Sequence, residues 1–167
     1  MPRHNDWAHT HKRRTMLRLK SGNIFSTPHK TITITANCVG VMETGIEKQA
    51  RTKSPEMFSR YQKLCKEGRI QVGIPYLIRS LSDYDKDILL FPTRHDWREP
   101  TKTAWIEEGL LRLQEGIKNS KLQGLALAPV GCAHEGLHFI PVLNLILLHL
   151  QELDCQIDIY TPRGYTV

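Results

Sequence analysis

The stretch GLALAPVG, residues 124–131, is apolar from end to end and closes on a glycine. A wholly apolar strand is typical of sheets that are covered by helices on both faces. The next residues, CAHEGLHF, lead into a second apolar run at 141–153 that has the composition of a buried helix. Together they predict a buried strand, a glycine-bounded loop and a helix, which is the repeating unit of an α/β fold.

The neighbouring segments alternate between strand and helix patterns. The β-branched alternation of TITITANCVG, residues 31–40, predicts a strand. A capping Ser54, Pro55 at the first helical position and Gly68 at the end predict a helix between them. The order of all elements predicts a three-layer α/β/α sandwich with a mixed central sheet. Further strands are expected at 16–23, 70–81, 87–93, 124–131 and 155–160, and further helices from Ile46, after Pro100 and at 141–153.

Size and charge divide the chain into two parts. The 167 residues suffice for one domain, expected at 15–167, preceded by a basic, His/Arg-rich segment at 1–14. Residues 1–20 hold six basic residues against one acidic residue, whereas the remainder holds 17 against 16. Such a segment is typical of polyanion binding and equally of a solvated tail. No signal-peptide pattern follows it, so we expect a cytoplasmic protein without membrane association.

The motif His134-Glu135-Gly136-Leu137-His138 matches the H-E-x-x-H signature of zinc peptidases. That signature works on a helix, where both imidazoles reach one metal ion. Gly136 and Pro141 disfavour a helix at this place, and the sequence nominates no third ligand. The four cysteines form no C-x-x-C pair and are expected to pack as small apolar residues. We therefore expect neither a metal ion nor another cofactor.

Two glycine-bounded loops follow buried strands, at 37–45 and 129–138. Ligands of α/β sheets bind at the carboxyl ends of the strands. Loops of this kind that lead into helices present backbone N–H groups, which bind phosphate oxygens without a basic side chain. Two such loops side by side predict a pyrophosphate site. The alternative, that each loop is only a tight connection, remains open at this point.

Several motifs, taken in order, resemble the macrodomain family. They are the Gly-Asn-Ile turn at 22–24, TANCVGVMETGIEKQ, SPEMFSRYQKLCKEGRIQVG, LLFPTRHDWREPT and LALAPVGCAHEGLHF. The resemblance extends from about Leu17 to Tyr160 and is closest to the branch of the DarG antitoxins, which remove ADP-ribose from thymidine bases in DNA. It implies a macrodomain fold, ADP-ribose binding and glycohydrolase activity.

The resemblance also assigns roles to individual residues. Asn23 and Ile24 would lie by the adenine, Asn37 by the distal ribose or the attached base, and the two loops around the diphosphate. Cys38 and Cys132 fall in the matched loops, which favours packing over a Cys/His nucleophilic pair. The residues expected to bind ADP-ribose are Asn23, Ile24, Asn37, Gly40, Val41, Met42, Thr44, Gly45, Ile46, Gly131, Cys132, Ala133, His134, Glu135, Gly136 and Leu137.

Three departures from the family pattern bear on catalysis. Arg94 stands where the branch has a catalytic lysine, and a guanidinium is a poor nucleophile or base, although it neutralises phosphate or developing charge. His138 replaces an acidic residue and can serve as a general base. Glu43 is a second candidate base, or a solvent-exposed side chain. The expected catalytic residues are thus His138, Glu43 and Arg94.

The segment RHDWREP, residues 94–100, combines charge with an aromatic ring. His95, Trp97 and Arg98 are expected to contact nucleic acid, since this mixture suits stacking on a base and holding its phosphate. The alternative is that Trp97 packs beneath the loop.

Two functions remain: a glycohydrolase acting on ADP-ribosylated nucleic acid, and a reader that binds ADP-ribose or a nucleotide without turnover. We expect a monomer, with a cognate ADP-ribosyltransferase toxin as a candidate partner.

Overall fold

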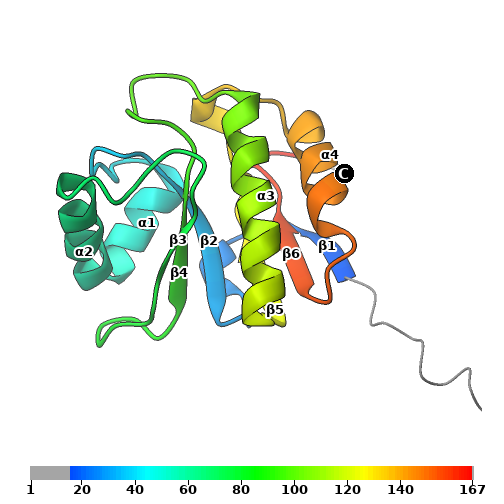
Figure 1. Cartoon of the computed structure of the whole chain (residues 1–167), viewed down its shortest axis with the longest axis horizontal. Coiled ribbons are helices and arrows are strands. Elements are labelled where there is room, and N and C mark those ends of the chain that lie inside the picture. Colours follow the sequence, from blue (N-terminus) through cyan, green and yellow to red (C-terminus); the bar gives the residue numbers. More distant parts are fainter. Residues whose placement is uncertain (1–15, 167) are drawn as a thin grey trace, which may run out of the picture.

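The computed structural model describes residues 16–166, and the basic segment predicted at 1–14 lies outside them (Figure 1). Six strands form one sheet in the order β1-β6-β5-β2-β4-β3. Five run parallel, and β3 alone pairs antiparallel, with β4. The predicted mixed sheet is therefore confirmed. The strands are β1 (Met16–Lys20), β2 (Thr31–Ala36), β3 (Tyr76–Ile78), β4 (Asp87–Pro92), β5 (Gly124–Leu127) and β6 (Gln156–Tyr160).

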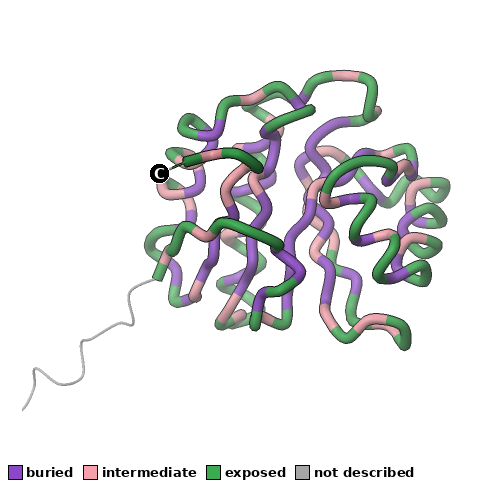
Figure 2. The backbone as a smooth tube through the Cα atoms, turned by 180° about the vertical axis from the view of Figure 1, so that it is seen from behind, coloured by how far each residue is buried: buried purple, intermediate pink, exposed green. Residues whose placement is uncertain are grey.

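Four helices cover the two faces of this sheet. They are α1 (Gly45–Lys53), α2 (Pro55–Lys66), α3 (Thr103–Ser120) and α4 (Phe139–Leu150). Successive strand residues face opposite layers, so Ile88 and Leu90 pack with α1 and α2, whereas Leu89 and Phe91 pack with α3 and α4. Burial follows the strands through the middle of the molecule (Figure 2). This is the three-layer sandwich that the apolar strands predicted.

Local signals account for most element boundaries. The Ser54 hydroxyl accepts a hydrogen bond from Met57 N at 3.1 Å and caps α2, as its sequence predicts. The helix after the second loop begins at Phe139, earlier than predicted, because Pro141 falls in its first turn, where a missing N–H breaks no helical hydrogen bond. β5 ends at Leu127, before Pro129.

The edge strand β3 is only three residues long, although 70–81 was predicted to be extended. Gly73 has a φ of +76° and Pro75 follows it, so the chain turns before it can pair with β4.

All four cysteines are free, with Cys132 and Cys155 buried and the other two partly buried. Within residues 16–166, no helix is both long and apolar enough to cross a bilayer.

Candidate functional site

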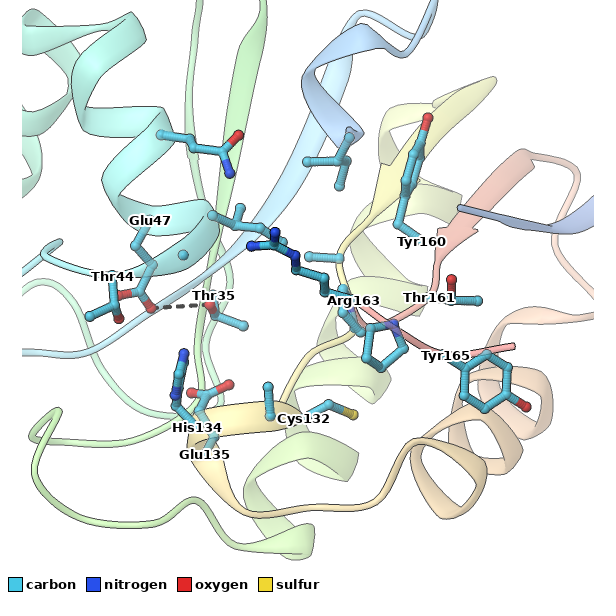
Figure 3. A pocket seen from close by; sticks show the side chains of 18 of the residues that line it. Thr35, Thr44, Glu47, Cys132, His134, Glu135, Tyr160, Thr161, Arg163 and Tyr165 are labelled. Carbon is cyan, nitrogen blue, oxygen red and sulfur yellow. Dashed lines mark hydrogen bonds between the residues drawn. The ribbon is translucent and has the colours of Figure 1, made fainter. Parts of the chain in front are cut away.

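A cavity of about 690 Å³ opens at the carboxyl ends of the central strands (Figure 3). Its volume falls within the range of roughly 300–1,000 Å³ that is usual for small-molecule sites, and its position is the one at which α/β sheets bind ligands. Its walls come from the turn after β1, the end of β2, the start of α1, the loop after β5 and the segment after β6. The lining residues are Ser21, Gly22, Asn23, Ile24, Thr35, Thr44, Gly45, Ile46, Glu47, Gln49, Arg94, Ala128, Pro129, Cys132, Ala133, His134, Glu135, Tyr160, Thr161, Pro162, Arg163, Gly164 and Tyr165.

The loop after β5 turns its backbone towards this cavity. Gly131, Ala133 and Gly136 have φ values of +78°, +60° and +97°, so three residues of a short loop adopt left-handed conformations. The φ of Gly131 is one that residues with a Cβ rarely adopt, and a Cβ there would lie 2.9 Å from Ile106 Cδ1, so glycine is favoured at this position. Among the described residues, the N–H groups of Ala133 and His134 have no hydrogen-bond acceptor. These two residues form a nest of donors on the cavity wall.

The N-terminus of α1 forms another wall. Thr44 precedes the helix with extended backbone, and its side chain makes no capping hydrogen bond. Within the described part of the chain, the N–H groups of Ile46 and Glu47 have no backbone acceptor. Helix N-termini carry unsatisfied donors and partial positive charge, and they bind anions for that reason. Two sets of N–H donors thus belong to one cavity.

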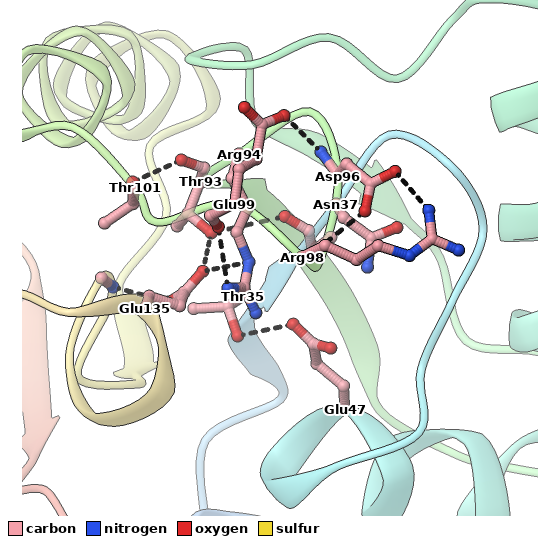
Figure 4. A network of polar contacts seen from close by, with 12 residues as sticks. Thr35, Asn37, Glu47, Thr93, Arg94, Asp96, Arg98, Glu99, Thr101 and Glu135 are labelled. Atoms are coloured by element: carbon pink, nitrogen blue, oxygen red, sulfur yellow. Dashed lines mark hydrogen bonds and ion pairs between the residues drawn. The ribbon is translucent and has the colours of Figure 1, made fainter.

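A buried polar network lies beneath the cavity and joins three loops (Figure 4). Glu135 accepts hydrogen bonds from the Thr93 hydroxyl and from Gly131 N, the latter at 3.0 Å. Arg94 lies beside it, with 3.5 Å between Arg94 Nε and Glu135 Oε1, and donates to the Glu99 carbonyl at 3.1 Å. Burial raises the pKa of Glu135, and the Thr93 hydrogen bond and Arg94 oppose that rise. The network fixes the loop that carries the donor nest.

A second buried carboxyl, Glu47, belongs to the first turn of α1 and is only 7% exposed. The Thr35 hydroxyl donates to Glu47 Oε1 at 3.0 Å. Burial raises the pKa of Glu47 to about 8; the charge of Glu135 adds to the rise, while the Thr35 hydrogen bond and Arg94 oppose it. Glu47 is therefore largely a neutral acid at pH 7.

Comparison with known proteins places this geometry in a family. The chain matches no protein-family model. It is 34% identical over 151 residues to the DNA ADP-ribosyl glycohydrolase of Mycobacterium tuberculosis, a match that covers 89% of this chain and 43% of that protein. The solved macrodomain of M. tuberculosis DarG has a TM-score of 0.80 and 33% identity, and the match covers 89% of this chain and 99% of that one.

The chain belongs to the macrodomain family, in the DarG branch. A third match is the solved structure of Thermosipho africanus DarTG in complex with ADP-ribose, with a TM-score of 0.82, 28% identity, and coverage of 93% of this chain and 45% of that one. The chain spans about two fifths of the length of the M. tuberculosis glycohydrolase. The resemblance inferred from the sequence motifs is confirmed.

The structure brings together many of the residues predicted to bind ADP-ribose in the macrodomain. Those that line the cavity come from the turn after β1, the start of α1 and the loop after β5. They are Asn23, Ile24, Thr44, Gly45, Ile46, Cys132, Ala133, His134 and Glu135. The others do not line the cavity: Asn37, Gly40, Val41, Met42, Gly131, Gly136 and Leu137.

Asn37 organises the first loop and does not line the cavity. Its Oδ1 accepts hydrogen bonds from the N–H groups of Val39 and Val41 and from the Tyr61 hydroxyl, and its Nδ2 donates to Val41 O at 2.8 Å. Met42 is completely buried in the core on the α1/α2 side of the sheet. Both residues support the turn that delivers Thr44 to the cavity.

Of the three predicted catalytic residues, only Arg94 lines the cavity. It is buried and ion-paired with Glu135, so it is not a surface residue. The side chain of Glu43 is 63% exposed and pairs with Arg51 at 2.6 Å, which agrees with the solvent-exposed alternative. His138 is exposed at the residue before α4.

The H-E-x-x-H letters do not form a metal-binding helix. Residues 133–135 make a single 3-10 turn, and Gly136 ends it in a left-handed conformation. The Glu135 carboxylate accepts hydrogen bonds from the Thr93 hydroxyl and Gly131 N and pairs with Arg94, so it is not free to bind a metal ion. Across residues 16–166, no group of three His, Cys, Asp or Glu side chains is placed to hold a metal ion.

The residues predicted to contact nucleic acid belong to the loop that follows Arg94 and do not line the cavity. Trp97 is 45% exposed, which excludes the alternative that it packs beneath the loop, and the Arg98 guanidinium lies 4.8 Å from its ring centroid. His95 packs edge-on against Trp105. Thr101 N donates to Glu135 O at 3.0 Å, so the loop carrying these residues is tied to the donor nest.

Sequence reasoning missed two parts of the cavity. Glu47 and Thr35 lie on an amphipathic helix and an alternating strand, where each pattern is explained without a ligand. The segment from Tyr160 to Tyr165 closes another side, and Arg163 extends into the space between Tyr160 and Glu47 (Figure 3). The one signal for this segment was its position, because it follows the carboxyl end of a parallel strand.

Proposed function

We propose that this macrodomain binds ADP-ribose in the cavity and removes it from nucleic acid, with ADP-ribosylated thymidine in DNA as the substrate. The observation that carries the proposal is the pair of N–H donor sets, at Ala133–His134 and at Ile46–Glu47, on two walls of one cavity. Two such sets offer one donor group to each phosphate of a diphosphate, which backbone donors bind without lysine or arginine. Two relatives support the choice of ligand: the DNA ADP-ribosyl glycohydrolase of M. tuberculosis and the T. africanus protein in its complex with ADP-ribose.

The two ends of the cavity differ in chemistry, and this difference orients the ADP-ribose. Ile24 and Tyr160 belong to one apolar cluster, and together with Asn23 they offer a flat, partly apolar end for the adenine. Glu47, Thr44 and His134 lie at the other end (Figure 3). With the diphosphate held by the backbone N–H groups at this end, the distal ribose and its glycosidic carbon lie near the side chains of Glu47 and His134.

The remaining predicted residues take supporting roles in the proposal. Gly40, Val41 and Met42 shape the first loop, while Gly131, Gly136 and Leu137 shape the second. Arg94 supplies positive charge beneath the distal end of the cavity. Glu43 and His138 enter catalysis only if a bound substrate draws them towards the cavity. The nucleic-acid strand runs past His95, Trp97 and Arg98.

A second function is a reader that binds ADP-ribose without turnover, and Arg94 is the observation that favours it. Its guanidinium remains charged and is held by Glu135 and the Glu99 carbonyl, so it cannot act as an amine nucleophile. We propose the hydrolase because the distal end also holds ionisable groups. We further propose a monomer, with an ADP-ribosyltransferase toxin as the candidate partner.

Calorimetric titration with ADP-ribose tests the binding proposal. Ala133→Asp places a carboxylate at the donor nest and is expected to weaken ADP-ribose binding at least about tenfold by like-charge repulsion, which is about 1.4 kcal/mol. Ala133→Asn is the matched control, because asparagine is isosteric, uncharged and equally tolerant of a left-handed φ. Equal affinities of the two variants, or no binding by the unmodified protein, would contradict the diphosphate assignment.

A further inference from the structure

Eight ionisable side chains line the cavity, and most are unsuited to moving a proton. Burial raises the pKa of the Cys132 thiol to about 11, which makes it a weak acid. Arg94 and Arg163 remain charged, and Tyr160 and Tyr165 lie away from Glu47 in the cavity (Figure 3). Both oxygens of Glu135 accept hydrogen bonds that hold the loop after β5. Glu47 and His134 are left, at the end opposite Tyr160.

Glu47 differs from Glu135 in having one oxygen committed and one free. Its Oε1 accepts from the Thr35 hydroxyl, and Oε2 makes no hydrogen bond within residues 16–166. The Thr35 bond holds the carboxyl in place at the cavity wall. A proton on Oε2 would therefore be available to a ligand atom at the distal end.

We infer that Glu47 is the catalytic acid of this macrodomain, protonating the nucleic-acid base as its bond to ADP-ribose breaks. This inference rests on the proposed function. The bond between the distal ribose carbon and the base nitrogen breaks, and its electron pair stays with the base, which takes the proton from Glu47. A water oxygen bonds to the same carbon, and the proton that this water releases returns to the Glu47 carboxylate. One water is consumed, and the products are ADP-ribose and the unmodified base.

The surroundings of Glu47 match this role. Arg94, which follows β4, and Glu135, in the loop after β5, face it with opposite charges, while Tyr61 of α2 and His134 lie on its other sides. The Arg94 guanidinium stabilises the carboxylate left after proton transfer. The pKa of about 8, which burial imposes, keeps the acid form populated at neutral pH.

The test compares Glu47→Gln with the unmodified protein on a thymidine-ADP-ribosylated oligonucleotide. The amide keeps the shape and the Thr35 hydrogen bond but cannot transfer a proton. We expect kcat to fall at least about 100-fold, in the range usual for loss of a general acid, with the calorimetric affinity for ADP-ribose within about threefold. Glu115→Gln, on the exposed face of α3, is the matched control and should leave kcat unchanged.

The pH dependence separates catalysis from structural support. An acid must be protonated, so kcat of the unmodified protein should decline as pH rises through about 8, and any residual Glu47→Gln rate should lack this decline. Thr35→Val should lower kcat without removing the pH dependence. The inference is overturned, and the proposed function kept, if Glu47→Gln keeps its kcat or if it loses ADP-ribose affinity in parallel. Binding of ADP-ribose without its release from DNA by the unmodified protein would overturn the proposed hydrolase, and the inference with it. Absence of ADP-ribose binding by the unmodified protein would instead overturn the proposed function, and the inference with it.

Discussion

Replacing Gly131 by alanine should destabilise the macrodomain and weaken its ligand binding together. Gly131 has a φ of +78°, where a Cβ costs about 1–2 kcal/mol. The new Cβ would lie 2.9 Å from Ile106 Cδ1 and 3.0 Å from Leu137 Cδ1, and relieving such overpacking costs about 1–3 kcal/mol. Because Ile106 is completely buried, both costs apply, and we expect a total loss of about 2–5 kcal/mol.

Urea denaturation measures this loss, and calorimetry with ADP-ribose measures the accompanying loss of affinity. Gly116→Ala is the matched control: Gly116 lies in α3 with open space around its Cβ position, so alanine should stabilise the chain by about 0.5–1 kcal/mol. If Gly131→Ala unfolds at the same urea concentration as the unmodified protein and binds ADP-ribose equally well, the reasoning about this loop is refuted.

Three further predictions concern the buried charges and Trp97. Glu47→Gln should gain stability relative to the unmodified protein as pH rises from 5 to 9. A carboxyl whose folded pKa is raised from 4.5 to about 8 loses its stabilising contribution over that interval. The gain should be on the order of 4 kcal/mol in urea denaturation curves, and a difference that stays constant with pH would contradict it. Arg94→Met should cost about 3–5 kcal/mol in the same assay, because Glu135 loses its buried counter-charge; a loss below about 1 kcal/mol would show that the pair contributes little. Trp97→Ala should change the free energy of unfolding by less than about 0.5 kcal/mol. It should weaken binding of an ADP-ribosylated oligonucleotide by about 1–3 kcal/mol and leave the affinity for free ADP-ribose unchanged. An equal loss for both ligands would show that the Trp97 ring does not contact the nucleic acid.

The layered fold was predictable because local signals and burial patterns agree with each other. Ser54 caps α2, as the sequence predicts, and the apolar residues 124–127 form a strand covered on both faces. The errors occur where a backbone detail overrides composition. Pro141 is accommodated in a first helical turn, and Gly73 and Pro75 reduce a predicted strand to three residues.

The site was only partly predictable, because its ionisable groups acquire their properties from distant segments. Glu47 resembles a solvated helix residue until Thr35 from β2 and Arg94 from the end of β4 are placed beside it. Asn37 was assigned to the ligand by resemblance, whereas its hydrogen bonds serve its own loop and Tyr61. Glycine positions and left-handed turns can be read from sequence, but the partner of a buried carboxyl depends on tertiary packing.

The central claim is tested most directly by incubating the protein with a thymidine-ADP-ribosylated oligonucleotide and following both products by mass. The account predicts multiple turnovers, with ADP-ribose released and the thymidine restored, and a rate that falls as pH rises through about 8. An oligonucleotide that stays modified for hours, although the protein binds ADP-ribose tightly, would contradict the hydrolase and leave the reader.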